Sequence, residues 1–164
     1  MNLSKLKKHF KKEKQDDDEE DDDDEKFIDN LLKSLNDDSN EYILDLTTEK
    51  IKKMNLEALQ ELSFPKETTR EYMKQLKTYV YIDELQNLRY GSFLRWISLK
   101  DPEPSKLILN KGALFCEIKV TDDGISLVVK NFRNKYFSLK FDEVMIFQKL
   151  KDQELVLLQA MDML

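Results

Sequence analysis

Apolar side chains recur every three to four residues over much of the stretch 27–79, which is the spacing of one helix face. Residues 27–35 show this spacing and predict a short amphipathic helix. The polar run 36–40, rich in Asn and Asp, predicts a linker after it. Either Thr47 or Thr48 can cap the next helix, whose apolar stripe ends at Leu62.

A third helix is expected over about residues 65–78. Pro65 suits its first turn, because the proline nitrogen carries no hydrogen that would be left unpaired there. The short break at residues 63–64 places this helix and the preceding one in a helical hairpin. The apolar face of the third helix is predicted to carry Tyr72, Met73, Leu76 and Tyr79.

After Tyr79 the pattern changes: β-branched and aromatic residues become frequent, and turn signals come close together. Residues 122–124 (Asp-Asp-Gly) predict a tight hairpin turn with the glycine at positive φ, and residues 133–135 predict a second turn. The apolar spacing of residues 152–164 predicts a C-terminal helix. Five strands are predicted, at residues 90–99, 113–120, 125–132, 136–141 and 144–149.

Helices followed by five short antiparallel strands and a last helix predict an α+β protein. Closing the strands into a small barrel of the SH3-like or Sm-like kind would remove the free edges of the sheet. A curled open sheet with a helix packed on it is the alternative. We expect a tail at residues 1–26, a helical lead-in at 27–88 and the barrel with its C-terminal helix at 89–164, with 27–164 as one folded unit.

The tail separates charges of opposite sign. Residues 1–14 carry six lysines and one glutamate, whereas residues 15–25 carry ten acidic side chains and no basic one. Because the whole chain has a net charge of −6, the part after the tail is close to neutral, which argues against a generally basic nucleic-acid-binding domain. A disordered basic tip and an extended, solvated acidic run are expected. The tail residues predicted to contact charged partners are Lys7, Lys8, Lys11, Lys12, Asp16, Asp17, Asp18, Glu19, Glu20 and Asp21.

Cysteine content and apolar run length bear on the compartment. Cys116 is the only cysteine, so no disulfide can form within the chain, which suits a reducing compartment. No apolar run approaches the ~20 residues that span a bilayer. We therefore expect an intracellular protein, in the cytoplasm, the nucleus or a virion.

Residues suited to catalysis are scarce after the tail. The only histidine, His9, lies within the tail, and three glycines are too few for a phosphate-binding loop. Cys116 falls on the predicted inward face of a strand, where a buried core residue is expected rather than a reactive thiol. Acidic pairs such as Asp122 with Asp123 fall at predicted turns, where Asp forms local hydrogen bonds. The sequence therefore predicts no catalytic residue, no metal site and no cofactor.

The run 89–96 mixes cations with aromatic rings, as platforms for single-stranded nucleic acid do. Along a strand, Tyr90, Leu94 and Trp96 would share one face. One face of the strand must be core, so part of this run is expected to be structural, with arginine reaching past it to solvent. The candidate surface for a partner or a nucleic acid comprises Arg89, Tyr90, Arg95, Trp96, Arg133 and Lys135.

The segment 79–97, YVYIDELQNLRYGSFLRWI, resembles uncharacterised small proteins of large nucleocytoplasmic DNA viruses, which share the pattern YxYxDEL…LxxGxxxRWI. The Lys-, Asn- and Asp-rich, glycine-poor composition is similar to that encoded by AT-rich viral genomes. The resemblance covers about residues 48–150 and implies a viral origin and an SH3-like or Sm-like fold, without an assigned activity. Residues 132–135 (Phe-Arg-Asn-Lys) lack the Arg-Gly pair of the Sm signature, which argues against an RNA-binding ring.

The sequence favours a non-enzymatic protein-interaction or structural module, with a virion among its expected settings and the charged tail as an arm that recruits partners. A nucleic-acid-binding protein that uses the aromatic and basic strand surface is the first alternative. An enzyme with carboxylate acid–base chemistry is the second. A protein partner is expected, nucleic acid is a further candidate, and the apolar C-terminal helix could pair with another chain.

Overall fold

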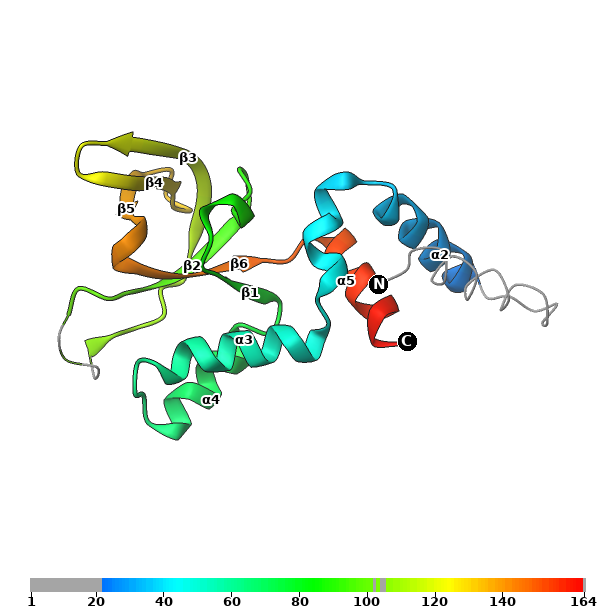
Figure 1. The fold of residues 1–164 in the computed structure, drawn as a ribbon, viewed down its shortest axis with the longest axis horizontal. Coiled ribbons are helices and arrows are strands. Elements are labelled where there is room, and N and C mark those ends of the chain that lie inside the picture. The colour runs from blue at the N-terminus through cyan, green and yellow to red at the C-terminus, as the bar shows by residue number, and fades with distance from the viewer. Residues whose placement is uncertain (1–21, 102, 104–105, 164) are drawn as a thin grey trace. The chain divides into compact units, whose positions relative to one another are not determined.

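The computed structural model describes residues 22–101, 103 and 106–163, and it has an α+β fold with one six-stranded antiparallel sheet (Figure 1). The chain divides into two compact units. Unit 1 comprises Met1–Thr48 and Lys151–Leu164, and unit 2 comprises Glu49–Leu150. The predicted tail contacts at Lys7–Asp21 lie outside the described residues.

Unit 1 is built from helix α2 (Asp22–Leu35), the 3-10 helix η1 (Asp38–Asp45) and helix α5 (Asp152–Asp162). The helices predicted at 27–35 and at the C-terminus are confirmed. Helix α2 starts earlier than expected, so residues 22–25 of the acidic run are helical rather than extended. Negative charge is favourable in the first turn of a helix, because the helix dipole is positive there.

The predicted linker at 36–40 is confirmed only at residues 36–37, because residues 38–40 already belong to η1. Asn40 is buried, and its Nδ2 donates hydrogen bonds to the Ser34 carbonyl oxygen and to Gln153 Oε1, both at 3.0 Å. These bonds join α2, η1 and α5. The polar residues of this stretch gave no indication in the sequence that one of them would be buried between helices. Apolar residues that are fully buried in unit 1 include Leu31, Ile43, Leu157 and Ala160.

Unit 2 begins with helices α3 (Thr48–Gln60) and α4 (Lys66–Gln75), which confirm the predicted helical hairpin. Ser63 turns the chain between them with a φ of 56°, and the rings of Phe64 and Tyr72 meet edge to face at 5.4 Å. Helix α4 ends at Gln75, before the predicted residue 78, because a strand starts at Tyr79.

The sheet contains six strands in the order β1-β6-β2-β3-β4-β5, with all neighbours antiparallel. Their bounds are β1 Tyr79–Ile82, β2 Phe93–Ser98, β3 Ala113–Thr121, β4 Gly124–Lys130, β5 Tyr136–Lys140 and β6 Val144–Lys149.

The predicted closed, five-stranded SH3-like or Sm-like barrel is therefore wrong. A sixth strand, β1, occupies one edge beside β6, and β5 forms the other edge of an open sheet. The pairing of β2 with β3 covers only Phe93 with Leu114 and Leu94 with Ala113 before the long 99–112 connection diverges. The alternative that the sequence left open, a curled open sheet with a helix packed on it, is closer: the sheet of unit 2 is open, and two helices, α3 and α4, pack on it.

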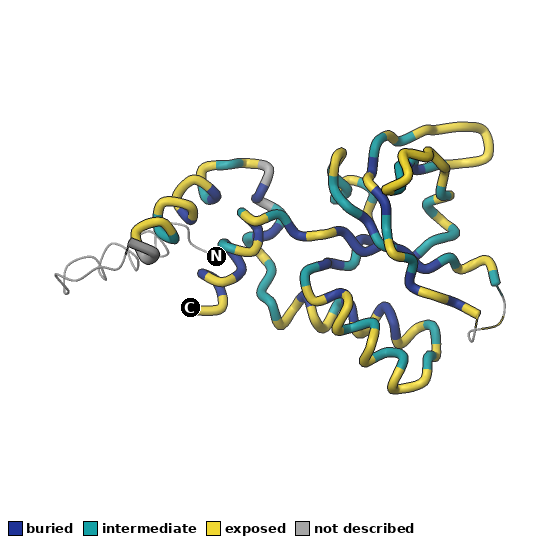
Figure 2. The backbone as a smooth tube through the Cα atoms, turned by 180° about the vertical axis from the view of Figure 1, so that it is seen from behind, coloured by how far each residue is buried: buried dark blue, intermediate teal, exposed yellow. Residues whose placement is uncertain are grey.

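Helices α3 and α4 cover one face of the sheet (Figure 1), and β2 and β6 each contain adjacent buried residues, which point to opposite faces (Figure 2). Ile97 and Phe147 belong to the cluster that includes Leu59 and Leu76 from the helical hairpin. Burial on both sides explains why Trp96 and Ile97 are both buried although they are adjacent in β2.

The predicted core position of Cys116 is wrong because β3 contains a bulge. The register with β4 shifts between Phe115 and Glu117, which leaves Cys116 as the extra residue. Before the bulge Phe115 is buried and Leu114 exposed, and Cys116 itself is half-buried. The two predicted turns are confirmed: Gly124 has a φ of 113° and Asn134 a φ of 61°.

The β1 edge of the sheet is closed by a side chain of α3. Asn55 is 2% exposed, its Nδ2 donates to the Tyr79 carbonyl oxygen at 2.9 Å, and its Oδ1 accepts from the Tyr81 backbone N–H at 2.8 Å. One amide thus pairs with β1 as a neighbouring strand would. This is a direct way to keep an edge strand from pairing with another chain.

Candidate interaction site

Strand β5 is the open edge of the sheet. It pairs with β4 from Ser126 opposite Lys140 to Lys130 opposite Tyr136. On its other side, none of the strands in the described part of the chain is a neighbour. Strand β5 thus differs from β1, whose edge Asn55 occupies. An unpaired row of backbone N–H and C=O groups is a template for an added strand.

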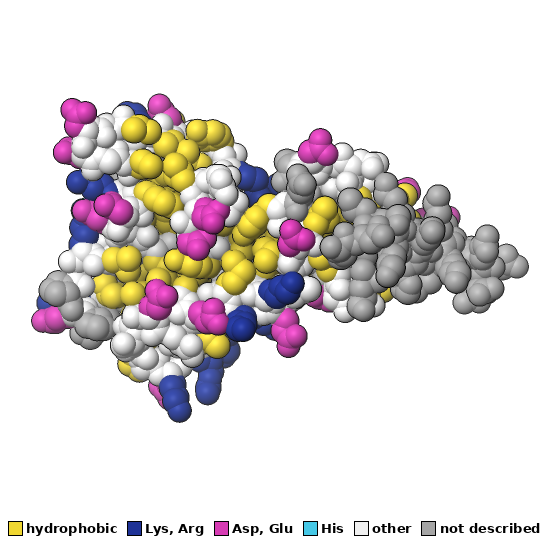
Figure 3. Space-filling model, viewed as in Figure 1, with side chains coloured by type: hydrophobic (Ala, Val, Ile, Leu, Met, Phe, Trp, Pro, Cys, Tyr) yellow, Lys and Arg dark blue, Asp and Glu magenta, His cyan; other side chains and the backbone are white. Residues whose placement is uncertain are grey.

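A pocket of about 530 Å³ adjoins this edge, between β5, the end of β2 and the 3-10 helix η4 (Phe141–Glu143). Trp96 and Phe137 form part of its wall, with their rings 5.7 Å apart at 54°. The Trp96 side chain is 7% exposed, whereas Phe137 is 37% exposed. Hydrophobic side chains gather over the sheet of unit 2 in the space-filling view (Figure 3).

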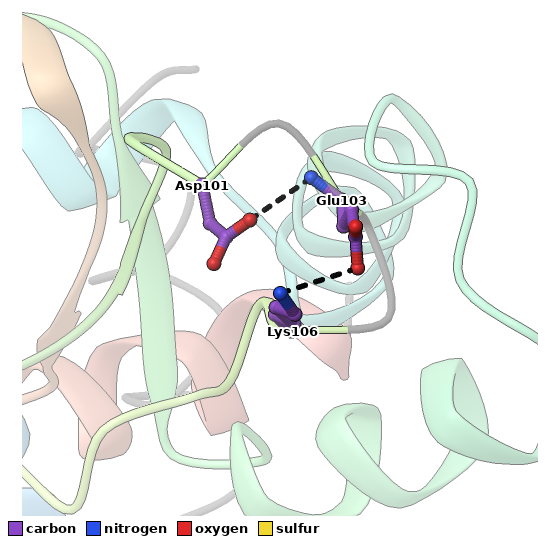
Figure 4. A network of polar contacts seen from close by, with 3 residues as sticks. All are labelled: Asp101, Glu103 and Lys106. Atoms are coloured by element: carbon purple, nitrogen blue, oxygen red, sulfur yellow. Dashed lines mark hydrogen bonds and ion pairs between the residues drawn. The ribbon is translucent and has the colours of Figure 1, made fainter.

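The 99–112 connection forms a second pocket, of about 500 Å³, which shares Ser98, Lys100 and Asn110 with the first. Polar contacts shape this connection (Figure 4): Asp101 Oδ1 accepts from the Glu103 backbone N–H at 3.0 Å, and Lys106 Nζ lies 3.4 Å from Glu103 Oε2. The two pockets therefore form neighbouring hollows whose shared residues lie between β2 and the connection.

Charges at the open edge are uneven. The stretch 124–141, which contains the whole β4–β5 hairpin, has four cationic side chains and no carboxylate. The cations are Lys130, Arg133, Lys135 and Lys140. Carboxylates follow at once in η4, where Glu143 Oε2 pairs with Lys100 Nζ at 3.0 Å. The turn end of the hairpin is consequently the more positive end of the β5 edge.

The residues predicted as a surface at 89–96 do not come together. Arg95 lies on the helix side, where its Nε donates to the Asn110 carbonyl oxygen and its Nη2 to Gln75 Oε1, both at 2.8 Å. Arg89 Nη2 donates to the Lys149 carbonyl oxygen at 3.2 Å. Tyr90, 67% exposed, stacks on Phe115 at 5.2 Å. Among these predicted residues, Trp96 lines the pocket beside β5.

Arg133 and Lys135 lie in the β4–β5 turn, and both side chains are exposed. The backbone N–H groups of both residues donate to Asn131 Oδ1, at 2.9 and 3.1 Å. The turn is therefore well ordered by its own hydrogen bonds. It presents the two cations at one end of the open edge.

Sequence reasoning missed a buried amide, Gln148, which is 1% exposed in the central strand β6. Its Oε1 accepts from the Arg89 backbone N–H at 2.9 Å and from Ser92 Oγ at 2.8 Å, and its Nε2 donates to the Asn87 carbonyl oxygen at 3.0 Å. These bonds fix the β1–β2 connection. The order of apolar and polar residues in β6 did not indicate that this polar side chain is buried.

Two tyrosines of β1 have altered ionisation. Burial raises the pKa of Tyr79, and the positive charge of Arg95 opposes this in part. Burial also raises the pKa of Tyr81, and Asp83 and Glu61 add to the effect. Both phenols are therefore neutral at physiological pH and belong to the helix-covered core rather than to the open edge.

Two kinds of feature are absent from the part of the chain that the structure describes. It holds no group of three or more His, Cys, Asp or Glu side chains placed to bind a metal ion. It also holds no helix with both the length and the apolar character needed to cross a membrane.

Comparisons of the chain with models of known families, with curated proteins and with solved structures found no match. The resemblance to viral proteins consequently stays a prediction, and the function has to be argued from the β5 edge and its pocket.

Proposed function

We propose that the protein is a non-enzymatic interaction module in which unit 2 binds an extended segment of a partner protein along β5. The observation that carries the proposal is the unpaired side of β5 beside a pocket whose wall includes the rings of Trp96 and Phe137. In strand addition, main-chain hydrogen bonds supply affinity, and pockets for alternate side chains supply specificity. Strand β5 has both parts of such a site.

The dimensions of the edge fit a short segment. Strand β5 has five residues, and at about 3.4 Å per residue it offers roughly 17 Å of unpaired backbone. Alternate side chains of an added strand would point toward the pocket, where Trp96 and Phe137 present aromatic surface. The partner segment is therefore expected to place an apolar side chain there.

A surface that stacks nucleic-acid bases has less support. Such platforms need exposed rings beside cations. Trp96 is nearly buried, and the Arg95 guanidinium is held by Asn110 and Gln75. Addition of a partner strand, in contrast, requires only the exposed backbone N–H and C=O groups of β5. The charged tail, whose predicted contacts at Lys7–Asp21 lie outside the described residues, stays in the proposal as an arm that recruits partners.

The proposal is tested by fluorescence anisotropy with the full chain and labelled peptides in which valine alternates with a polar residue, serine, glutamate or lysine. At least one peptide is expected to bind. N-methylation of the amides that face β5, which are every second one along the peptide, should abolish binding, because the methylated nitrogens cannot donate to β5. N-methylation of the other amides should leave binding intact. Failure of all three peptides to bind, or binding that survives N-methylation of either set of amides alike, would refute strand addition.

A protein variant gives a second readout in the same assay. Phe137→Ala removes part of the pocket wall and is expected to weaken peptide binding about tenfold, as loss of a buried apolar contact does. Phe132→Ala is the matched control, because Phe132 lies in the same hairpin, is 79% exposed and does not line the pocket. Equal affinities of the two variants would argue against the pocket. Circular dichroism checks that both are folded.

A further inference from the structure

We infer that the partner segment is acidic: the β5 edge selects an extended polypeptide in which apolar side chains alternate with Asp or Glu. This inference rests on the proposed function and adds the chemistry of the occupant. It is carried by charge complementarity at the edge, because the stretch 124–141 has four cations and no carboxylate.

The position of the cations bears on how the segment would lie. Arg133 and Lys135 are exposed in the turn at one end of β5, and Lys140 is exposed at the other end and lines the pocket. Asp142 and Glu143 follow Lys140, and Glu143 is paired with Lys100. The acidic side chains of the partner are therefore expected to lie mainly opposite the turn, away from η4.

The apolar requirement comes from the pocket. Its apolar lining is Trp96, Phe137, Leu139 and Val144, and the rest is polar or charged: three serines, Lys100, Asn110, Lys140 and Glu143. Lys100 is paired with Glu143, and an acidic side chain placed against the two aromatic rings would lose its hydration, which is costly. The two requirements fit a strand with alternating faces, since successive side chains point to opposite sides.

A polynucleotide would also be attracted to these cations, and two exposed rings, Phe132 (79%) and Tyr136 (64%), lie in the same hairpin. Lys130 Nζ lies 5.8 Å from the centre of the Tyr136 ring, over its face, and the Trp96 ring in the pocket is nearly buried. The unpaired β5 backbone complements another backbone and not a base edge. The observations therefore favour an acidic polypeptide over single-stranded nucleic acid.

The test compares the glutamate–valine, serine–valine and lysine–valine peptides on the full chain, with oligothymidylate as a fourth probe. The glutamate peptide is expected to bind at least tenfold more tightly than the serine peptide, and added salt should reduce this difference. The lysine peptide should bind most weakly. Equal binding of the glutamate and serine peptides would overturn the acidic preference but leave strand addition standing. Failure of every peptide would refute the proposed function itself.

Variants that remove charge test whether the preference for the acidic peptide comes from the cations at the β5 edge. The triple variant Arg133→Gln, Lys135→Gln and Lys140→Gln is expected to bind the glutamate peptide about tenfold more weakly. Its affinity for the serine peptide should not change. The matched control is Lys52→Gln, Lys66→Gln and Lys74→Gln, which removes the same charge from exposed positions on α3 and α4. Equal loss in both variants would mean that net charge alone attracts the peptide. Tighter binding of oligothymidylate than of the glutamate peptide, lost in the first variant only, would overturn the assignment in favour of nucleic acid.

Discussion

Replacement of Phe147 by alanine is expected to lower the free energy of unfolding of unit 2 by about 3–5 kcal/mol, the usual cost of a large-to-small change at a buried phenylalanine. Phe147 is 0% exposed, lies in the central strand β6 and packs in the cluster that joins the sheet to the helical hairpin. Its ring also meets Tyr81 at 5.7 Å. Removing it leaves a cavity where α3, α4 and the sheet meet.

Chemical denaturation followed by circular dichroism measures this loss. Phe132→Ala is the control, because Phe132 is 79% exposed and a surface substitution of this kind changes stability by no more than about 0.5 kcal/mol. If the two variants unfolded at the same denaturant concentration, the packing described for the face beneath α3 and α4 would be incorrect.

Gly112→Ala is expected to lower the free energy of unfolding by about 2–5 kcal/mol, for two reasons that act together. Gly112 has a φ of 111°, which L-residues rarely adopt. A Cβ atom there would lie 2.6 Å from the Leu94 carbonyl oxygen and 2.5 Å from the Phe93 ring. The ring could shift, but the carbonyl belongs to the backbone of β2 at its short pairing with β3.

The Gly91→Ala variant separates the cost of a positive φ from the cost of the steric clash. Gly91 has a φ of 80°, but a Cβ atom there would meet nothing within 4 Å. This variant therefore carries backbone strain alone, about 1–2 kcal/mol. Thermal or chemical unfolding of both variants should place Gly112→Ala clearly below Gly91→Ala. The opposite order would show that the 99–112 connection does not approach β2 as described.

Periodicity predicted the elements well, because most of them bury a regular face. Both helices of the hairpin, the strands from β2 onward and α5 lie where spacing and turn signals placed them. The turns at Gly124 and Asn134 followed from residue types that tolerate positive φ. Strand β1 was missed because Tyr79 fits the end of a helical stripe as well as the start of a strand.

Features that depend on contacts distant in sequence could not be predicted. A closed barrel requires β5 to pair with a second strand besides β4. The apolar and polar pattern of β5 does not indicate whether such a pairing forms. The bulge at Cys116 reverses the faces of β3 without a glycine to mark it. Asn55 and Gln148 are polar and would be expected at the surface, but both are buried and hydrogen-bonded to the backbone.

The candidate site illustrates the same limit. The sequence singled out 89–96 for its aromatic and basic mixture, but those residues divide among the core, the helix side and the start of β3. Arg133 and Lys135, identified from the same composition, do lie at the open edge. The signal that could have found the rest is the absence of carboxylates over 124–141.

Amide hydrogen exchange of the full chain, measured by NMR with and without the glutamate–valine peptide, tests the central claim most directly. The amides of β5 that face away from β4 are expected to exchange at least tenfold more slowly when the peptide is bound, because they become paired. The Tyr81 amide, already bonded to Asn55, should not change. Bound peptide with unchanged exchange along β5 would contradict strand addition at this edge.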